Sequence, residues 1–268
     1  MKMDDRFAIL VYSCIKNSDM WTPFIKLLKK YWPDRKYRII LLSDKAPDRV
    51  EGFDAVVAID GSWYEMIMAG LEVAKTPYVS LWMDDYFLYD HIDNASLDKQ
   101  LDNAEKYNAG NIRFIESSIV PSRRWRKDKN YNIVKPGTQY SLSTQIGIWN
   151  TDFLKKNLRP DRSAWEFERK TSLENADRNH LLLVCRDYDF PYEEVVTKGK
   201  WTDNGVRFLR RERIDVDYKR RKAMSSFEMA KLFFFKGILE MAPGFIVICQ
   251  NCIYDIKDKL KSLVSEEK

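Results

Sequence analysis

Apolar runs of strand length alternate with segments of helical periodicity over the first hundred residues, and this alternation restricts the fold more than any other feature. The spacing predicts strands at 7–14, 37–42, 55–59 and 77–83, and helices at 21–31 and 62–74. Ser62 and Glu65 have the spacing of a capping box at the start of the second helix. Strand–helix–strand alternation is typical of an α/β fold with a mostly parallel sheet flanked by helices.

Two adjacent acids, Asp84 and Asp85, end the fourth predicted strand. Divalent cations such as Mn²⁺ and Mg²⁺ prefer oxygen ligands, and parallel α/β sheets bind ligands beyond the carboxyl ends of their strands. The sequence therefore predicts a site for a sugar nucleotide at this edge, with Asp85 and Asp84 as metal ligands. The donor-binding candidates here are Ser13, Asn17, Asp44 and Asp84. The alternative is that the acid pair only caps a helix or a turn.

The pattern is less regular after residue 110. We expect a strand at 111–115, a long polar loop at 117–138, a strand over 141–150 and a helix at 151–158. Long loops in compact domains are usually functional lids or disordered segments. Ser163 then begins a further helix, with Glu166 at the capping-box position.

These features together resemble bacterial glycosyltransferases of the GT-A fold, of the kind that assemble capsule or lipopolysaccharide. The resemblance covers roughly residues 7 to 202 and is carried by four elements: the early βαβ half, the acid pair, the S-x-Q-x-x-x-W segment at 143–149, and the S-A-W-E-F-E helix start at 163–168. It implies a GT-A-like, Rossmann-type, mostly parallel sheet. The acid pair is Asp-Asp rather than Asp-x-Asp, and there is no Q-x-x-R-W motif.

The resemblance also implies roles for individual residues. In the family, the acid pair holds a divalent metal against the donor pyrophosphate, which points to Asp84 and Asp85. A carboxylate at the start of a later helix takes the proton of the acceptor hydroxyl, which points to Glu166 or Glu168. Residues two apart on a helix diverge by about 200°, so only one of these two carboxylates can face the site. The alternative for Glu166 is a purely capping role.

Lys200 is a further donor-binding candidate. The segment Lys198-Gly199-Lys200 follows the apolar Val195-Val196 and could bring a cation and a closely approaching backbone to the donor diphosphate. The alternative for this segment is a surface turn. Basic residues also cluster at 123–127 and 207–222, within a formal net charge of +5. Either cluster could face phosphate, or be solvated surface. The sequence has no RNA- or DNA-binding motif, so no nucleic-acid partner is predicted.

From Phe227 onward the chain predicts helices at 227–241 and 245–256, separated by Pro243-Gly244. The run without charges from Met241 to Tyr254 is too short to span a bilayer. We expect an interfacial helical extension that contacts the inner face of the cytoplasmic membrane. The alternatives are docking on the catalytic domain or a homodimer interface. The predicted domains are therefore a GT-A-like catalytic domain at 1–222 and this helical segment at 223–268.

The cysteine pattern and the N-terminus predict a cytoplasmic protein. Cys249 and Cys252 form a C-x-x-C, but no second pair completes a zinc set, and reduced thiols are the default. The N-terminus lacks the apolar segment of a signal peptide.

The predicted function is a hexosyl-type glycosyltransferase. It would use Mn²⁺ or Mg²⁺ to move a sugar from a nucleotide-sugar donor to a glycan or lipid-linked glycan acceptor. The alternatives are a sugar nucleotidyltransferase and a non-catalytic module that binds a glycan or nucleotide. A nucleotidyltransferase usually carries a Gly-rich segment after the first strand, and residues 13–17 contain no glycine.

Overall fold

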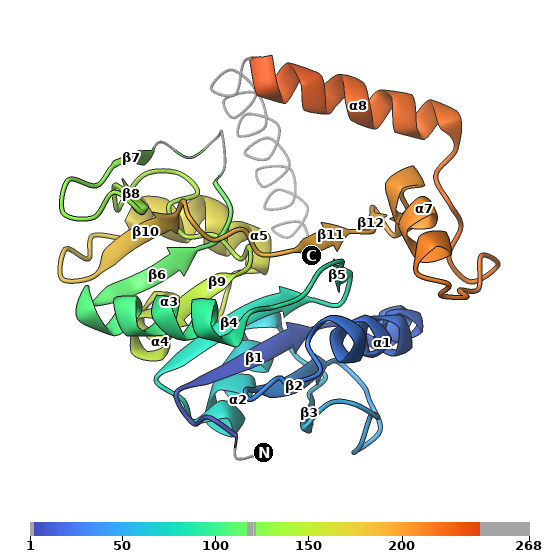
Figure 1. Cartoon of the computed structure of the whole chain (residues 1–268), viewed down its shortest axis with the longest axis horizontal. Helices are drawn as coiled ribbons and strands as arrows, with labels where there is room; N and C mark the ends of the chain where they lie inside the picture. The colour runs from blue at the N-terminus through green and yellow to red at the C-terminus, as the bar shows by residue number, and fades with distance from the viewer. Residues whose placement is uncertain (1–2, 117–119, 121, 242–268) are drawn as a thin grey trace, which may run out of the picture. The chain divides into compact units, whose positions relative to one another are not determined.

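The structure is a computed structural model that describes residues 3–116, 120 and 122–241 (Figure 1). The chain divides into two compact units. One contains the residues up to Glu116 together with Val120–Ala223, and α8 (Ser226–Met241) belongs to the other. The predicted helix at 245–256 and the C-x-x-C motif lie outside the described residues.

Within the described residues the first unit is built on a nine-stranded sheet of order β3-β2-β1-β4-β9-β6-β10-β8-β7. The strands are β1 (Phe7–Tyr12), β2 (Arg38–Ser43), β3 (Ala55–Ala58), β4 (Tyr78–Met83), β6 (Ala109–Arg113), β7 (Ser122–Arg124), β8 (Tyr131–Val134), β9 (Gly147–Asn150) and β10 (Leu181–Cys185). Strands β1 to β4 pair in parallel, as do β6 and β10, whereas β9 runs antiparallel between β4 and β6. This mixed sheet, covered by helices, confirms the predicted α/β class.

Helices cover both faces of this sheet. On one face, α1 (Trp21–Tyr31) and α3 (Asn94–Lys106) bury apolar side chains against the core; the rings of Phe24 and Trp82 lie 6.1 Å apart. On the other face, α2 (Trp63–Ala74) approaches β2 so closely that a Cβ on Gly70 would lie 2.8 Å from a Leu42 methyl. α4 (Thr151–Asn157) follows β9 directly. The capping box of Ser62 and Glu65 at the start of α2 is present as predicted.

The sequence-based elements were wrong in two places. The predicted loop at 117–138 contains β7 and β8, which pair with each other and extend the sheet beyond β10. The predicted strand over 141–150 forms only at its end, as β9, because Ser141 to Thr144 bond to a helix instead of to a neighbouring strand. Edge strand β7 exposes Arg123 and Arg124, and such charges discourage pairing with other chains.

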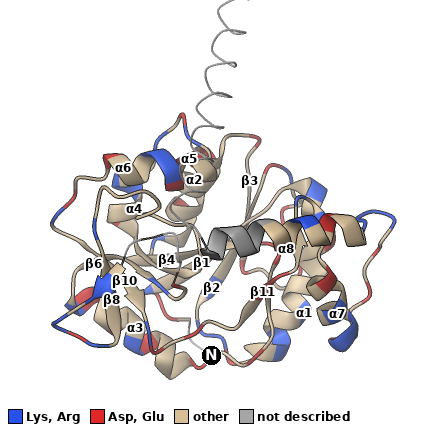
Figure 2. Cartoon of the chain, turned by 90° about the horizontal axis from the view of Figure 1, so that it is seen from above, with Lys and Arg blue, Asp and Glu red and all other residues tan. Residues whose placement is uncertain are grey.

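Small elements extend the fold beyond the carboxyl ends of the central strands. β5 (Tyr86–Leu88) pairs with β11 (Tyr192–Glu194), and β12 (Val196–Thr197) forms a hairpin with β13 (Lys200–Trp201) (Figure 1). The hairpin turn needs positive φ at Lys198 (52°) and Gly199 (74°). α7 (Asp203–Arg211) follows. Lys30 and Tyr31 at the end of α1 bond Glu212 just after α7, so the ends of the two helices lie close together. Figure 2 shows the chain from above.

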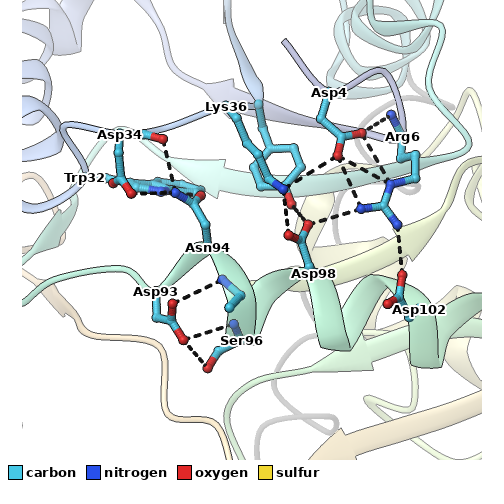
Figure 3. A network of polar contacts seen from close by, with 12 residues as sticks. Asp4, Arg6, Trp32, Asp34, Lys36, Asp93, Asn94, Ser96, Asp98 and Asp102 are labelled. Carbon is cyan, nitrogen blue, oxygen red and sulfur yellow. Dashed lines mark hydrogen bonds and ion pairs between the residues drawn. The ribbon is translucent and has the colours of Figure 1, made fainter. Parts of the chain in front are cut away.

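An ionic network ties the amino ends of β1 and β2 to α3 (Figure 3). Asp98 on α3 accepts hydrogen bonds from Lys36 at 2.6 Å, from Arg6 at 3.1 Å and from the Tyr37 hydroxyl. This network lies at the opposite end of the strands from Asp84 and Asp85.

Among the described residues, no helix combines the length and the apolarity that crossing a membrane requires.

Candidate active site

Asp84 lies at the carboxyl end of β4 and is 5% exposed. Its Oδ2 accepts a hydrogen bond of 2.5 Å from the Ser13 hydroxyl, which itself accepts one of 2.7 Å from the Trp21 indole. The Asn17 side chain also bonds Asp84. Ser13 directly follows β1, and Asn17 lies on the short helix η1 (Ile15–Met20). The parallel register of β1 and β4 thus brings these three predicted residues together.

Arg221 joins this cluster from the end of the first unit. Its guanidinium donates to Asp19 at 2.9 and 3.0 Å, to Asn17 Oδ1 at 2.8 Å and to the Gly199 carbonyl at 3.2 Å. It also stacks over the Trp201 ring at 5.8 Å. Sequence reasoning placed Arg221 only within a basic cluster, because no motif connects position 221 to the strand ends.

Asp84 and Asp85 are buried next to each other, so it is unfavourable for both carboxyl groups to be ionised. Burial raises the pKa of Asp84 to about 6, although hydrogen bonds from Ser13 and Asn17 and the charge of Arg221 oppose the rise. The pKa of Asp85 is raised to about 7 by burial first, then by the charges of Asp84 and Glu194. A cation at this position would relieve the repulsion.

The donor set suits a divalent cation that is completed by phosphate oxygens and water. Asp85 accepts no hydrogen bond from another side chain within the described part of the chain, so its carboxylate is available as a ligand. No group of three or more His, Cys, Asp or Glu side chains among those residues is arranged to hold a metal. Two carboxylates are nevertheless enough for a Mg²⁺-type site that takes its other ligands from a substrate diphosphate.

Two other predicted donor-binding residues lie around this cluster. Asp44, at the end of β2, accepts hydrogen bonds from the backbone N–H groups of Ile15 at 2.6 Å and Lys45 at 2.9 Å, so it orders the loop after β1. Lys200 lies on β13 opposite Thr197, next to Gly199, whose carbonyl bonds Arg221. This bond links the hairpin backbone to Arg221, a cation whose charge acts on both acids. The role of Lys200 in donor binding stays a prediction.

The two candidate bases have different surroundings. Glu166 ends α5 (Ala164–Glu166), where it completes a capping box with Ser163 and pairs with Lys170 at 3.0 Å. Glu168 lies in η2 (Phe167–Thr171), a turn of π-helix that continues into α6 (Ser172–Glu174). Single π-turns inside helices frequently occur at functional sites. The surroundings of Glu166 thus match the capping alternative.

The charges of both Glu168 and Asp85 act on the Tyr86 hydroxyl. Its pKa lies well above the ordinary value because of burial first, then because of Tyr192, Glu194, Asp85 and Glu168. The Tyr86 and Tyr192 rings are 4.6 Å apart. The Tyr86 hydroxyl, at the start of β5, is thus within electrostatic reach of both Asp85 and Glu168.

Neither a protein-family model nor a curated protein matches this chain. Solved structures do. TarS 1–349 from S. aureus, a GT-A-type glycosyltransferase, in complex with UDP-GlcNAc is 17% identical with a TM-score of 0.50, over 75% of this chain and 60% of that one. The same fragment with UDP is 15% identical with a TM-score of 0.46, over 81% of this chain and 67% of that one.

The chain spans 60% of TarS 1–349 without a named ligand and 37% of the longer TarS chain. The sheet order, the helices on both faces and the similarity to TarS in complex with UDP-GlcNAc together give the chain a GT-A-type fold.

Proposed function

We propose that this protein is a glycosyltransferase that uses a nucleotide-sugar donor. The observation that carries the proposal is the buried acid pair at the end of β4, held against the loop after β1 and beside Arg221. This is the edge at which α/β sheets bind nucleotides. The fold shared with a TarS structure that contains UDP-GlcNAc supports a uridine nucleotide sugar as the first donor to test.

Each part of the site has a role in this proposal. Asp85, supported by Asp84, would bind Mn²⁺ or Mg²⁺, which when present supplies Lewis-acid stabilisation of the departing diphosphate. Ser13 and Asn17 hold the Asp84 carboxylate in place, and Asp44 orders the loop that would contact the nucleoside. Arg221 would offset the charge of the diphosphate, and Lys200 would approach it from the neighbouring hairpin. Glu168 would accept the proton of the acceptor hydroxyl.

The acceptor and the location belong to the same proposal. We propose a hexosyl transfer to a surface glycan such as a capsule or lipopolysaccharide precursor, carried on a lipid at the inner face of the cytoplasmic membrane. Phe227 is 80% exposed and Phe233 is 57% exposed on α8, and exposed rings of this kind favour an interface with lipid.

A thermal-shift panel tests the donor site. Nucleoside diphosphates and nucleotide sugars, each with and without Mn²⁺, are added to the protein and to the Asp85→Ala and Arg221→Met variants. A ligand that binds the native state raises the Tm by mass action. We expect one nucleotide to stabilise the protein in a Mn²⁺-dependent way, with the shift lost in Asp85→Ala and reduced in Arg221→Met.

The other outcomes separate the alternatives. A stabilising nucleotide sugar that is never turned over would indicate a binding module. Formation of a nucleotide sugar from a nucleoside triphosphate and a sugar phosphate would indicate a nucleotidyltransferase. If no nucleotide changes the Tm, the proposed donor site is wrong.

A further inference from the structure

The segment Ser141–Thr144 is bound along its length to the helix that carries Glu168. The Ser172 hydroxyl accepts from Leu142 N at 2.8 Å and donates to Leu142 O at 3.1 Å, while the Ser141 hydroxyl donates to the Ser172 carbonyl at 3.3 Å. All three residues are fully buried or nearly so. These bonds hold the segment irrespective of Glu168.

A second set of bonds from the same segment ends on one oxygen of Glu168. Oε1 accepts from the Ser143 hydroxyl at 3.0 Å, from the Thr144 hydroxyl at 2.9 Å and from Thr144 N at 2.5 Å. No hydrogen bond reaches Oε2 from the described residues. A carboxylate has about four lone-pair sites, so three donors on one oxygen fix the plane of the group and leave the other oxygen as the acceptor.

A buried cation lies close to this carboxylate. Arg113, at the end of β6, is 1% exposed and donates to the Ser141 carbonyl at 3.2 Å. Burial lowers its pKa to about 10, and the charge of Glu168 opposes that shift. An isolated buried charge is costly, so the nearby Glu168 carboxylate offsets part of the cost of burying this guanidinium.

We propose that Ser143 and Thr144 are positioning residues that fix Oε1 of Glu168, so that Oε2 takes the proton of the acceptor hydroxyl. The assignment deepens the proposed function and rests on it. In the reaction, the acceptor oxygen forms a bond to the anomeric carbon while the bond from that carbon to the diphosphate oxygen breaks. The electron pair leaves with the nucleoside diphosphate, and the hydroxyl proton moves to Oε2.

A double-mutant cycle tests this role. UDP-GlcNAc, or whichever nucleotide sugar of the panel stabilises the chain most, is incubated with the full chain and Mn²⁺, and release of the nucleoside diphosphate is measured with water as acceptor. We expect Thr144→Val and Ser143→Ala each to lower kcat by about tenfold, with KM for the donor changed less than about twofold. In the Glu168→Gln background the same substitutions should have no further effect, because groups that act as a unit are not additive.

The pH dependence of kcat distinguishes positioning of Glu168 from a purely structural role of Ser143 and Thr144. A carboxylate that loses donors to its ionised form binds its proton more tightly. The acidic limb of the kcat profile of Thr144→Val should therefore move to higher pH. Ser172→Ala is the matched control: it removes bonds to the same segment without touching Glu168, so it should lower the Tm but keep kcat within about twofold and leave the acidic limb in place.

The outcomes distinguish this assignment from the function on which it rests. If the donor is turned over but the effects of Thr144→Val and Glu168→Gln multiply, Ser143 and Thr144 act independently of Glu168 and the assignment fails alone. The same holds if Ser172→Ala moves the profile as Thr144→Val does. If no nucleotide sugar is turned over under any condition, the proposed function and this assignment fall together.

Discussion

At the scale of the residue, the ionisation of the Asp84 and Asp85 carboxyl groups affects the stability of the fold. Their raised pKa values mean that the native state holds protons which the unfolded chain releases near the ordinary Asp value of 3.8. Stability from these groups is therefore greatest below about pH 4 and falls as the pH rises toward 7. A cation bound between them would remove this cost.

Replacing Asp85 by Asn should stabilise the protein in the absence of metal. One pKa unit corresponds to about 1.4 kcal/mol, and the pKa of Asp85 rises from 3.8 to about 7. Because Asp84 shares the effect, we expect the advantage of Asp85→Asn in the free energy of unfolding to grow by about 1–2 kcal/mol between pH 5 and pH 8. Urea unfolding at the two pH values measures it. An advantage of the same size at both would contradict the repulsion described here.

Sequence reasoning could assign some of the residues to the site but not others. Ser13, Asn17 and Asp84 could be grouped because each follows a strand of one parallel sheet, and the register of that sheet is set by its topology. Arg221 could not, since its position depends on how the segment after α7 folds back onto η1. Glu166 and Glu168 could not be separated either. Their hydrogen bonds distinguish them, and those depend on the tertiary packing of Ser141–Thr144.

At the scale of the element, the helix at 163–174 combines a cap and a π-turn. Partial burial raises the pKa of Glu166, but hydrogen bonds from Ser163 and Lys170 outweigh it and lower the pKa to about 2. The stability that this carboxylate contributes is thus present above the ordinary value of 4.5 and is lost as the pH falls through about 2.

Glu166→Ala should lower the free energy of unfolding by about 1 kcal/mol at pH 7, the usual value of a cap. The loss should shrink as the pH falls below 4.5, toward the pKa of about 2. Donor turnover should be unchanged, in contrast to Glu168→Gln. Unfolding curves and the nucleoside diphosphate release assay measure both effects. Loss of turnover in Glu166→Ala with the Tm retained would show that the catalytic carboxylate has been assigned to the wrong residue.

The ionic network at the amino ends of β1 and β2 should contribute to stability without affecting the site (Figure 3). Asp98→Ala leaves the hydroxyl of fully buried Tyr37 without its partner and removes the shorter of the two ion pairs of Lys36, which should cost about 2–3 kcal/mol. Asp102→Ala is the control, because Asp102 is 67% exposed and should cost under about 1 kcal/mol. Neither should alter the nucleotide-induced thermal shift; a change in Asp98→Ala alone would show that the two ends of the sheet are coupled.

Elements with strong local periodicity could be predicted from the sequence. Elements that form only by pairing or packing with distant parts of the chain could not. The four parallel strands and α1 and α2 follow apolar spacing and capping signals in the sequence. β7 has no apolar residue and β8 is only four residues long; β8 forms on the strand edge that β10 offers, and β7 pairs with β8. The π-turn at Glu168 has no sequence signal at all, since it arises where Phe167 packs against Trp149 and Trp63 while Glu168 bonds Thr144.

At the scale of the whole molecule, the two units differ in composition. The first buries apolar side chains on both faces of its sheet. The second contains α8, on which Phe227 and Phe233 are exposed. The proposed contact with an anionic membrane would use exposed residues of two kinds. The exposed basic residues of 207–222, which do not include the buried Arg221, would face lipid headgroups, and the rings of α8 would enter the interface.

Flotation with vesicles tests this contact. The full chain should float with vesicles that contain phosphatidylglycerol at low salt and less so as salt screens the basic residues. Burying a Phe side chain is worth about 1.5–3 kcal/mol, so Phe227→Ser combined with Phe233→Ser should weaken binding by at least about tenfold. A chain that ends at Ala223 should stay in the lower fraction yet keep the nucleotide-induced thermal shift. Flotation of that shorter chain would assign the membrane contact to the first unit, whereas a full chain that stays unbound and elutes as a dimer would assign α8 to self-association.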